Sequence, residues 1–532
     1  MGRAALVLLA LAIVVGLPFA LRPEENLFAA ADDTLVVVTP HNEAIRYEFT
    51  KAFGEHYRAE TGRTVRIDWR MPGGASEIAR FLKGEFFAAF ENEGRRSGRA
   101  WTPEVAASFD NPKIVPAEDP ASDDPGEAAR RAFLASTNGI GIDVFFGGGA
   151  YDFQIQAAAG RLADSGVVER HPSWFGEDSI PKDVSGEPFR DPAGLWIGAV
   201  VSSFGICYNR DSLRRLGVHE LPAAWSDLGR PEFFKQVALA DPTKSGSAAK
   251  AFEMILQQQM QERVKAAPED GLEAALADGW EDGLRIIQRA SANARYFTDA
   301  GSKVPVDVSQ GDAAIGMCID FFGRFQSEAV KVGDAPSRLQ YFTPAGGSSV
   351  GVDPIAMLRG APNPDAARRF IDFVLSIEGQ KLWNFKVGTP GGPARYALRR
   401  MPVRKELYAP EFRQFRSDPD VMPYEEAKLF TYHPEWTGRL FSTIGFIVRV
   451  ACLDPHDEQV AAWKALVAAG FPPEATARFG DLSAVGYEAA RERIRPALSA
   501  AGRIAEVRLA KELGDHFRSQ YREAERLAKE GR

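Results

Sequence analysis

Short apolar runs alternate with amphipathic segments along the first third of the chain. Residues 34–39 are apolar enough for a buried strand, and apolar positions then recur at helical spacing over about 45–53. Apolar and polar residues alternate at 65–69, and a further apolar run at 139–146 leads into three consecutive glycines. Strands that alternate with helices in this way predict a parallel-rich α/β sheet, whose ligands bind beyond the carboxyl ends of the strands.

A second α/β set begins after the apolar strand predicted at 195–208. It contains an amphipathic helix at about 248–264 and a strand at 313–319. The segment 351–358 then leads into an amphipathic helix at 366–375, which we expect to return the chain to the first set. The pattern therefore predicts an α/β protein with two lobes, each a mixed, parallel-rich sheet flanked by helices.

The first 31 residues have the layout of a secretory signal. The basic Arg3 precedes an apolar stretch from Ala4 to Ala20, and small residues stand before Asp32. An uncleaved anchor is the alternative, because the apolar stretch is close to membrane-spanning length. We therefore expect export to the periplasm or another extracytoplasmic compartment, with a membrane tether if the leader is retained.

The end of the chain is predicted to be helical. Apolar residues recur at helical spacing over 440–448, and Arg439 and Arg449 keep this run short of a membrane span, which favours a core helix. The predicted division is a signal peptide or N-terminal anchor at 1–31, a first lobe at 32–200 with a surface insertion at about 94–124, a second lobe at 201–350, a return segment with closing helices at 351–400, and a helical C-terminal extension at 401–532.

Composition and charge narrow the classes of function. Hydrophobic residues make up 45% of the chain and charged residues 26%, as in ordinary globular proteins. The net charge of -8 argues against a broad basic surface for nucleic acid, so any attraction for an anion must be local. The three cysteines are widely spaced and lie in apolar runs, so we expect buried side chains and no zinc site. No cofactor is predicted, and we expect a monomer.

Several common catalytic motifs are missing from the sequence. It has no H-E-x-x-H, no G-x-x-x-x-G-K and no G-x-G-x-x-G after a strand. We therefore expect a binding protein rather than an enzyme. A secreted α/β hydrolase or transferase is the alternative, and it would require a nucleophile and a base within hydrogen-bond reach of each other.

The strongest candidate site is the loop at 241–247, between a predicted strand and a predicted helix. Backbone N–H groups at the start of a helix lack partners, and the helix dipole favours negative charge there. Hydroxyl groups and an ammonium add donors, so the loop suits an anion; the alternative is plain helix capping by a serine. The residues concerned are Lys244, Ser245, Gly246 and Ser247, and the same chemistry is offered by Gly74, Ser76, Gly148 and Gly149 in the first lobe and by Ser302 in the second.

Three further side chains stand in or directly after predicted strands. His41 follows the strand at 34–39, where it would either add positive charge to a site or occupy a turn. Asp320 follows the strand at 313–319 and would either accept hydrogen bonds from a ligand hydroxyl or amine, or form a turn. Asp353 precedes a proline and has either a hinge role or a turn role.

Several stretches resemble one known family. These stretches are 200–209, 241–247, 352–356 and 361–376, the last followed by Glu378 and Gly379. From about 34 to 396 the chain resembles the extracellular solute-binding proteins of ABC importers. Among these proteins, the chain is similar to a branch that has the two-lobed type II periplasmic-binding fold. This branch is associated with ferric iron, sugar phosphates and aminoethylphosphonate. The resemblance implies a solute held in a cleft between the lobes and delivered to an ABC permease in the membrane.

The resemblance also implies which loops face the cleft. With these loops included, the predicted ligand-binding residues are Thr39, His41, Asn42, Gly74, Ser76, Gly148, Gly149, Ser202, Ser203, Lys244, Ser245, Gly246, Ser247, Ser302, Asp320 and Asp353. Iron-binding members carry two adjacent tyrosines where this chain has Phe321 and Phe322, and phenyl rings cannot bind a hard cation. We therefore expect a small solute that bears a phosphate, phosphonate or carboxylate group. A ferric-iron importer component and a membrane-tethered sensory domain are the alternatives.

Overall fold

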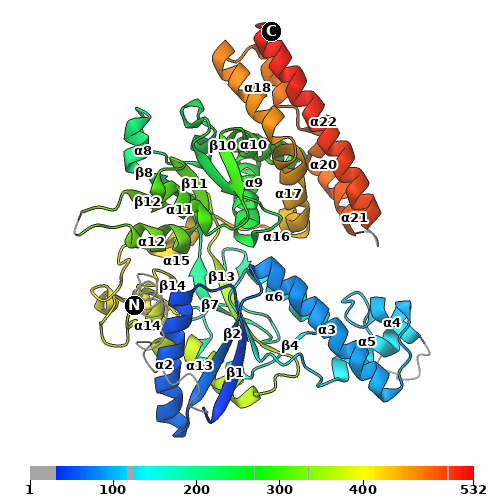
Figure 1. Ribbon diagram of the computed structural model, residues 1–532, viewed down its shortest axis with the longest axis vertical. Helices are drawn as coiled ribbons and strands as arrows, with labels where there is room; N and C mark the ends of the chain where they lie inside the picture. The colour runs from blue at the N-terminus through cyan, green and yellow to red at the C-terminus, as the bar shows by residue number, and fades with distance from the viewer. Residues whose placement is uncertain (1–30, 117–123, 269, 334, 500–502) are drawn as a thin grey trace, which may run out of the picture.

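The computed structural model describes residues 31–116, 124–268, 270–333, 335–499 and 503–532. It shows two α/β lobes and a set of C-terminal helices that pack on the second lobe (Figure 1). The two-lobed α/β architecture predicted from the sequence is therefore confirmed. The predicted signal sequence lies outside the described residues, apart from its last position.

Lobe 1 is built on a seven-stranded mixed sheet of order β14-β7-β13-β3-β1-β2, with β4 paired to β13. β1 is parallel to β2 and β3, whereas β13 is antiparallel to β3 and β7. Its strands are β1 (Asp33–Val38), β2 (Val65–Arg70), β3 (Val144–Phe146), β4 (Leu162–Ala163), β7 (Ile197–Ser202), β13 (Gly351–Leu358) and β14 (Met401–Pro402). Its helices are α2 (Glu43–Thr61), α3 (Ala75–Ser97), α4 (Pro103–Ser108), α5 (Pro125–Ala135), α6 (Ala150–Ala159), α7 (Val167–Arg170), α13 (Pro364–Leu375) and α14 (Ile377–Asn384).

Lobe 2 repeats this arrangement of strands in a five-stranded sheet of order β10-β9-β11-β8-β12. β9 is parallel to β10 and β11, whereas β8 is antiparallel to β11 and β12. Its strands are β8 (Phe204–Asn209), β9 (Val237–Ala240), β10 (Ala294–Thr298), β11 (Ile315–Ile319) and β12 (Leu339–Phe342). Its helices are α8 (Arg210–Arg215), α9 (Gly246–Ala266), α10 (Leu272–Ala292), α11 (Lys303–Gln310) and α12 (Asp320–Ala329).

The chain passes between the lobes at three places in the part that the structure describes. Ser203 alone separates β7 from β8, and the segment 343–350 joins β12 to β13. The third passage follows β14 at about 427–433, where the backbone N–H of Tyr432 donates to the Ser185 carbonyl at 2.7 Å. The lobes are therefore joined at three places within the described part of the chain.

A buried ionic network lies beside these crossings. The ammonium of Lys250, on α9, lies 2.9 Å from carboxylate oxygens of Glu187 and Glu253 and 3.6 Å from the centre of the Tyr432 ring. Glu187 belongs to the small hairpin of β5 (Asp183–Val184) and β6 (Glu187–Pro188), which precedes β7. The network therefore joins lobe 1, lobe 2 and the third crossing segment.

The C-terminal extension shares one hydrophobic core with lobe 2. Ile444 and Phe517 of the extension belong to the same buried cluster as Phe252 and Trp280 of lobe 2. Residues 401–433 hold mainly short helical turns, including α15 (Pro423–Glu426), so long helices begin only beyond them. The later helices are α16 (Pro434–Thr437), α17 (Phe441–Val448), α18 (His456–Ala469), α19 (Pro473–Phe479), α20 (Tyr487–Ala489), α21 (Arg495–Ser499) and α22 (Arg503–Lys529), with π-helical turns at Arg449–Leu453 and Ala490–Ile494.

One stretch of the extension is long and apolar enough to cross a membrane by length and composition. It runs from Pro434 to Leu453, and it is the only such stretch among the residues that the structure describes. Most of it is buried against lobe 2, and Ile447 and Val448 belong to the shared core. The core helix predicted at 440–448 is therefore confirmed.

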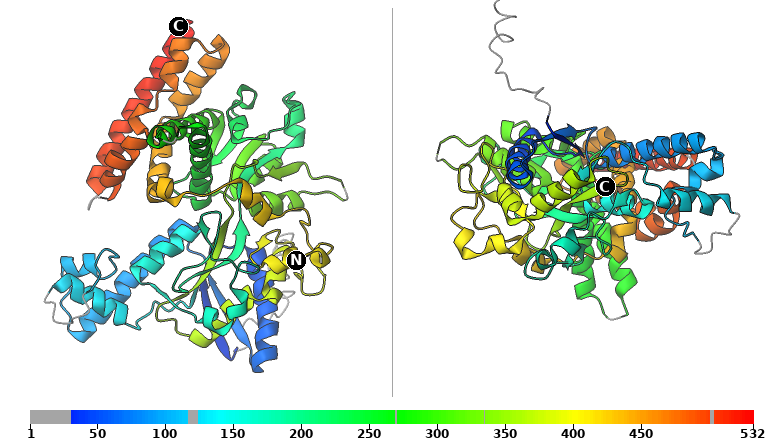
Figure 2. Two further views of the ribbon diagram at one scale, coloured as in Figure 1. Left: turned by 180° about the vertical axis from the view of Figure 1, so that it is seen from behind. Right: turned by 90° about the horizontal axis from the view of Figure 1, so that it is seen from below.

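The predicted surface insertion at 94–124 begins within α3. This helix extends well beyond the body of lobe 1 and carries α4 and α5 at its far end (Figures 1 and 2). Phe90 stacks on Phe109 with ring centres 5.0 Å apart, and Phe133 packs edge-on against both rings. An aromatic cluster therefore holds these helices together.

Candidate ligand-binding site

Two long helices from different lobes begin at the same interlobe interface. Gly74 is the N-cap of α3, and Ser245 is the N-cap of α9. A Cβ atom on Gly74 would lie 3.8 Å from the carbonyl oxygen of Lys244, and one on Gly246 would lie 3.6 Å from the Ser76 Oγ. The positive ends of the two helix dipoles therefore face one small region.

The loops of lobe 2 complete this region. The Oγ atoms of Ser245 and Ser247 lie 3.1 Å apart, and a Cβ atom on Gly301 would lie 2.9 Å from both. Ser302, the next residue, is exposed at the start of α11. The structure thus brings the five lobe 2 residues predicted to bind an anion into contact with one another or into adjacent positions.

The glycine loop of lobe 1 reaches the same place. Gly147 and Gly148 have φ of 88° and 116°, which non-glycine residues rarely adopt, and Gly149 is the N-cap of α6. A Cβ atom on Gly148 would lie 2.9 Å from the Cβ of Ala75, in the first turn of α3. We call the residues at these converging ends the helix-start group: Gly74, Ser76, Gly148, Gly149, Lys244, Ser245, Gly246, Ser247 and Ser302.

The ammonium of Lys244, which was predicted to add donors for an anion, is paired with carboxylates in the structure. It lies 2.6 Å from a carboxylate oxygen of Asp299 and 3.9 Å from one of Asp241. The hydrogen bond with Asp299 raises the pKa of Lys244. Asp299 lies 55 residues away in the chain, so local sequence could not reveal this pair.

A second group of predicted residues surrounds a buried arginine. Arg400 is fully buried, donates to the Ser202 Oγ at 3.0 Å, pairs with the Asp353 carboxylate, and lies 3.2 Å from the His41 Nε2. Its guanidinium carbon lies 3.9 Å from the centre of the Phe321 ring, which belongs to lobe 2. Sequence reasoning missed Arg400, since an arginine that follows another arginine, Arg399, gives no signal of burial.

His41 is neutral in this setting, which disfavours the first of its two predicted roles, the addition of positive charge. Burial, reinforced by the nearby charges of Arg400 and Arg46, holds the pKa of His41 well below its usual value. The imidazole packs edge-on against Phe146 with ring centres 4.6 Å apart, and its Nδ1 has no hydrogen-bond partner among the described residues. Because a guanidinium can only donate, the Nε2 of His41 is the acceptor of the hydrogen bond from Arg400.

Asp320 lies beside this arginine at the start of α12. Burial raises the pKa of its carboxyl to about 7, although Arg324 and Arg400 act in the opposite direction. Its backbone N–H donates to the Ser203 carbonyl at 2.9 Å, and the Ser203 Oγ lies 3.1 Å from the Thr343 Oγ1. Burial also raises the pKa of Asp353, against the opposing effect of Arg400.

The remaining two predicted residues have evident local functions. The Thr39 Oγ1 accepts a hydrogen bond from the His41 backbone N–H at 3.1 Å, which shapes the turn after β1. The Asn42 side chain caps α2 by accepting from the Ile45 N–H at 3.1 Å. We call the residues around the buried guanidinium the Arg400 group: Thr39, His41, Ser202, Ser203, Asp320, Asp353 and Arg400.

Gly147 connects the two groups. A Cβ atom at this position would lie 2.5 Å from the His41 Nε2, so the loop that begins α6 rests directly on the imidazole. The helix-start group offers backbone N–H groups and hydroxyls to a ligand. The Arg400 group offers a neutral imidazole, hydroxyls and the carboxyls of Asp320 and Asp353. The pKa values of both carboxyls are raised, so each is protonated at a higher pH than an exposed aspartate.

Residues 347–351 match the G-x-S-x-G pattern of serine hydrolases, which the sequence prediction of a binding protein did not take into account. Ser349 is 1% exposed, and its hydroxyl donates to Glu187 at 2.6 Å. The segment leads from lobe 2 into β13, rather than forming the exposed strand-to-helix turn that such a nucleophile requires. These residues therefore form part of the segment that connects the two lobes.

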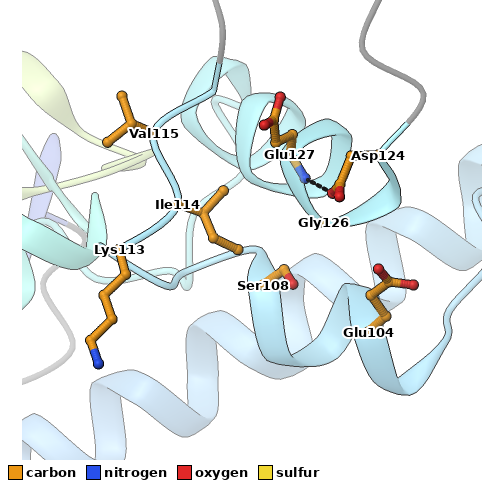
Figure 3. Close-up of a pocket in the computed structure, with 8 residues that line it drawn as sticks. All are labelled: Glu104, Ser108, Lys113, Ile114, Val115, Asp124, Gly126 and Glu127. Carbon is orange, nitrogen blue, oxygen red and sulfur yellow. Dashed lines mark hydrogen bonds between the residues drawn. The ribbon is translucent and has the colours of Figure 1, made fainter.

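A surface cavity of about 500 Å³ lies elsewhere, between α4 and α5 at the tip of lobe 1 (Figure 3). Its lining consists of Glu104, Ser108, Lys113, Ile114, Val115, Asp124, Gly126 and Glu127. Three carboxylates against one ammonium suit an anion poorly, and none of the predicted ligand-binding residues lies here.

Two α/β lobes, joined by crossing strands and presenting helix starts to each other, form the architecture of a two-lobed solute-binding protein. The family of bacterial extracellular solute-binding proteins matches residues 141–417, which is more than half of the chain. The chain therefore belongs to this family. The resemblance seen in the sequence is confirmed.

Curated relatives are similar over part of their length. An uncharacterized protein of Haemophilus influenzae is 28% identical over 254 residues, which cover 47% of this chain and 62% of that protein. The phosphoglycerate transport regulatory protein PgtC of Salmonella typhimurium is 24% identical over 186 residues, which cover 35% of this chain and 40% of PgtC. The chain thus spans less than two thirds of either relative.

Solved structures of binding proteins are also similar. The periplasmic binding protein AfuA from Actinobacillus pleuropneumoniae, with fructose-6-phosphate bound, is 18% identical with a TM-score of 0.46, over 75% of this chain and 94% of AfuA. Iron-bound HitA from Pseudomonas aeruginosa is 16% identical with a TM-score of 0.45, over 77% of this chain and 98% of HitA.

Proposed function

We propose that this protein is the extracytoplasmic solute-binding component of an ABC importer. In this role it holds a small anionic solute between its lobes and delivers it to a permease in the membrane, without chemical change to the solute. Membership of the extracellular solute-binding family supports the binding role. The name of the Salmonella relative, a phosphoglycerate transport regulatory protein, favours a phosphate-bearing solute.

The observation that carries the proposal is the meeting of α3 and α9. Their N-caps, Gly74 and Ser245, lie on opposite sides of the interlobe interface, so backbone N–H groups in the first turns of both helices can bind one acid group, although the Gly74 N–H itself donates to Glu77. Ser76 and Ser247 add hydroxyl donors that do not obstruct a close approach. An anion between the two helix starts would favour the closed arrangement, because it needs both lobes at once.

The Arg400 group would bind the remainder of the solute. Its hydroxyls, imidazole and protonatable carboxyls suit hydroxyl or amino groups. Arg400 itself is already paired with Asp353, so it orients these groups rather than contributing a free charge.

Isothermal titration calorimetry of the purified protein tests the proposal. The panel contains phosphoglycerate, fructose 6-phosphate, inorganic phosphate, a phosphonate, a dicarboxylate, neutral fructose and ferric citrate. Lys244→Ala should weaken binding of the preferred anion about tenfold, since a charge-assisted hydrogen bond contributes about 1.5–3 kcal/mol and Asp299 offsets part of it. The control variant is Lys265→Ala. Lys265 lies at the far end of α9, the helix that follows Lys244, so its replacement should leave the affinity for the anion unchanged.

Two results would contradict the proposal. Tight binding of neutral fructose, unaffected by Lys244→Ala, would place the specificity elsewhere. Binding of ferric ion in preference to every anion would favour an iron-uptake role, despite the phenyl rings of Phe321 and Phe322 at the interface.

A further inference from the structure

Helix α17 of the C-terminal extension is fixed to lobe 2. Ile444, Ile447 and Val448 belong to the same buried core as the α9 side chains. A Cβ atom on Gly445 would lie 3.5 Å from the carbonyl oxygen of Pro242, so α17 rests against the loop at 241–247. This helix lies beyond residue 417, outside the stretch that matches the solute-binding family.

The first turn of α17 contacts lobe 1. The ring centres of Phe441 and Tyr151 lie 4.6 Å apart with an angle of 42° between the planes. Tyr151 is the second residue of α6 and follows the glycine loop of the helix-start group directly. The nearby Ser442 hydroxyl opposes the rise in the pKa of the Tyr151 phenol that burial causes.

This contact is set apart from the strands that cross between the lobes. In two opposite views α17 stands over one end of α6, while β7 and β13 pass between the lobes beside it (Figures 1 and 2). Opening the lobes about these strands would separate Phe441 from Tyr151. Both rings would then lose their shared contact and expose apolar surface to water, which is unfavourable.

We propose that α17 is a latch for lobe closure, in which Phe441 and Ser442 bind Tyr151 only when the lobes are closed. The latch joins the two loops of the helix-start group, because α17 rests on one of them and Tyr151 follows the other. It stabilises the closed form before any solute is present, and so lowers the free energy that the solute must supply. The inference rests on the proposed function only in assuming that the lobes open and close.

The latch predicts a measurable shift in the ligand-free protein. Spin labels on Lys83→Cys in α3 and Lys464→Cys in α18 report the distance between lobe 1 and the extension by double electron–electron resonance. Both positions are exposed, and the three native cysteines are buried. Phe441→Ala and Tyr151→Ala should each lower the ratio of closed to open molecules about two- to tenfold, the range expected for one aromatic pair.

Several variants separate the latch from general damage to the fold. Tyr151→Phe keeps the ring and should retain most of the closed population, and Phe441→Leu should give an intermediate result if Phe441→Ala unfolds the helix. Phe471→Ala removes a partly exposed ring of the same extension that packs on Trp463, and it should not change the ratio.

The double variant Tyr151→Ala/Phe441→Ala should open the protein no further than either single variant, because the two side chains form one contact. An unchanged distance distribution in both single variants, or additive effects in the double variant, would overturn the latch. These measurements require no solute, so they stand apart from the identity of the ligand. If calorimetry shows an anion-specific site while the spin-label distances stay the same in the single variants, the proposed function is upheld and the latch is refuted.

Discussion

The guanidinium carbon of Arg400 lies 3.9 Å from the centre of the Phe321 ring, which places an arginine of the return segment on a helix of lobe 2. A cation over an aromatic face is attracted by the ring quadrupole. The same guanidinium pairs with Asp353 within lobe 1. One buried side chain therefore contacts both the interior of lobe 1 and the interlobe interface.

Replacing Arg400 by methionine should lower the free energy of unfolding by about 3–5 kcal/mol, because the Asp353 carboxylate would remain buried without its cation. Urea denaturation followed by circular dichroism measures this loss. Adding Asp353→Asn to the Arg400→Met variant should recover part of the stability. Equal losses in the single and double variants would show that the ion pair is not the cause.

The contribution of Asp320 to stability should increase as the pH falls from 8 to 5. Burial raises the pKa of this carboxyl to about 7 in the folded protein, from a usual value of 3.8. Between these values the native state binds more protons than the unfolded chain, so stability falls as the pH rises through this window. Asp320→Asn should therefore show a shallower decline between pH 5 and pH 8, by at most about 3 kcal/mol, because about two pH units of this shift lie within the window at about 1.36 kcal/mol each.

Urea titrations at several pH values test this slope. Asp152→Asn provides a second case, because burial also raises the pKa of Asp152 to about 7. If both variants keep the pH dependence of the unchanged protein, neither carboxyl titrates in this window.

Asp299→Asn should strengthen binding of the anionic solute about two- to threefold. Asp299 lies 2.6 Å from the Lys244 ammonium and is 80% exposed, so its removal frees the cation at little cost to the fold. The gain should be larger at low ionic strength, since exposed charges are screened by salt. Calorimetry at two salt concentrations measures it, and weaker binding would mean that Asp299 itself contacts the solute.

Gly147→Ala should destabilise the protein far more than Gly149→Ala. At Gly147 the φ of 88° is unfavourable for alanine, and the new methyl would meet the His41 ring at 2.5 Å, for a loss of about 2–4 kcal/mol. At Gly149 no atom lies within 4 Å of the new methyl, and the loss should be at most about 1 kcal/mol, from a poorer helix cap. Thermal unfolding compares the two, and similar losses would show that the His41 contact is not what requires glycine at position 147.

The sequence by itself determined the elements and the order in which they build two lobes. Periods of two and of 3.6 residues depend only on neighbours in the chain, and so do helix caps such as Ser245. The loop at 241–247 could therefore be placed at the start of a helix, and the apolar run at 440–448 could be assigned to a core, from local pattern alone.

The tertiary structure decided which side chains pair with each other and which of them carry a charge. Lys244 meets Asp299 across 55 residues, and Arg400 meets His41 across 359, so neither partner is visible in a local pattern. The neutral state of His41 depends on burial and on two arginines that only folding brings near it. The contact between Tyr151 and Phe441 likewise exists only because α17 packs on one lobe and α6 belongs to the other. Burial and long-range contact set the energies of these groups, and both are properties of the folded chain rather than of any segment within it.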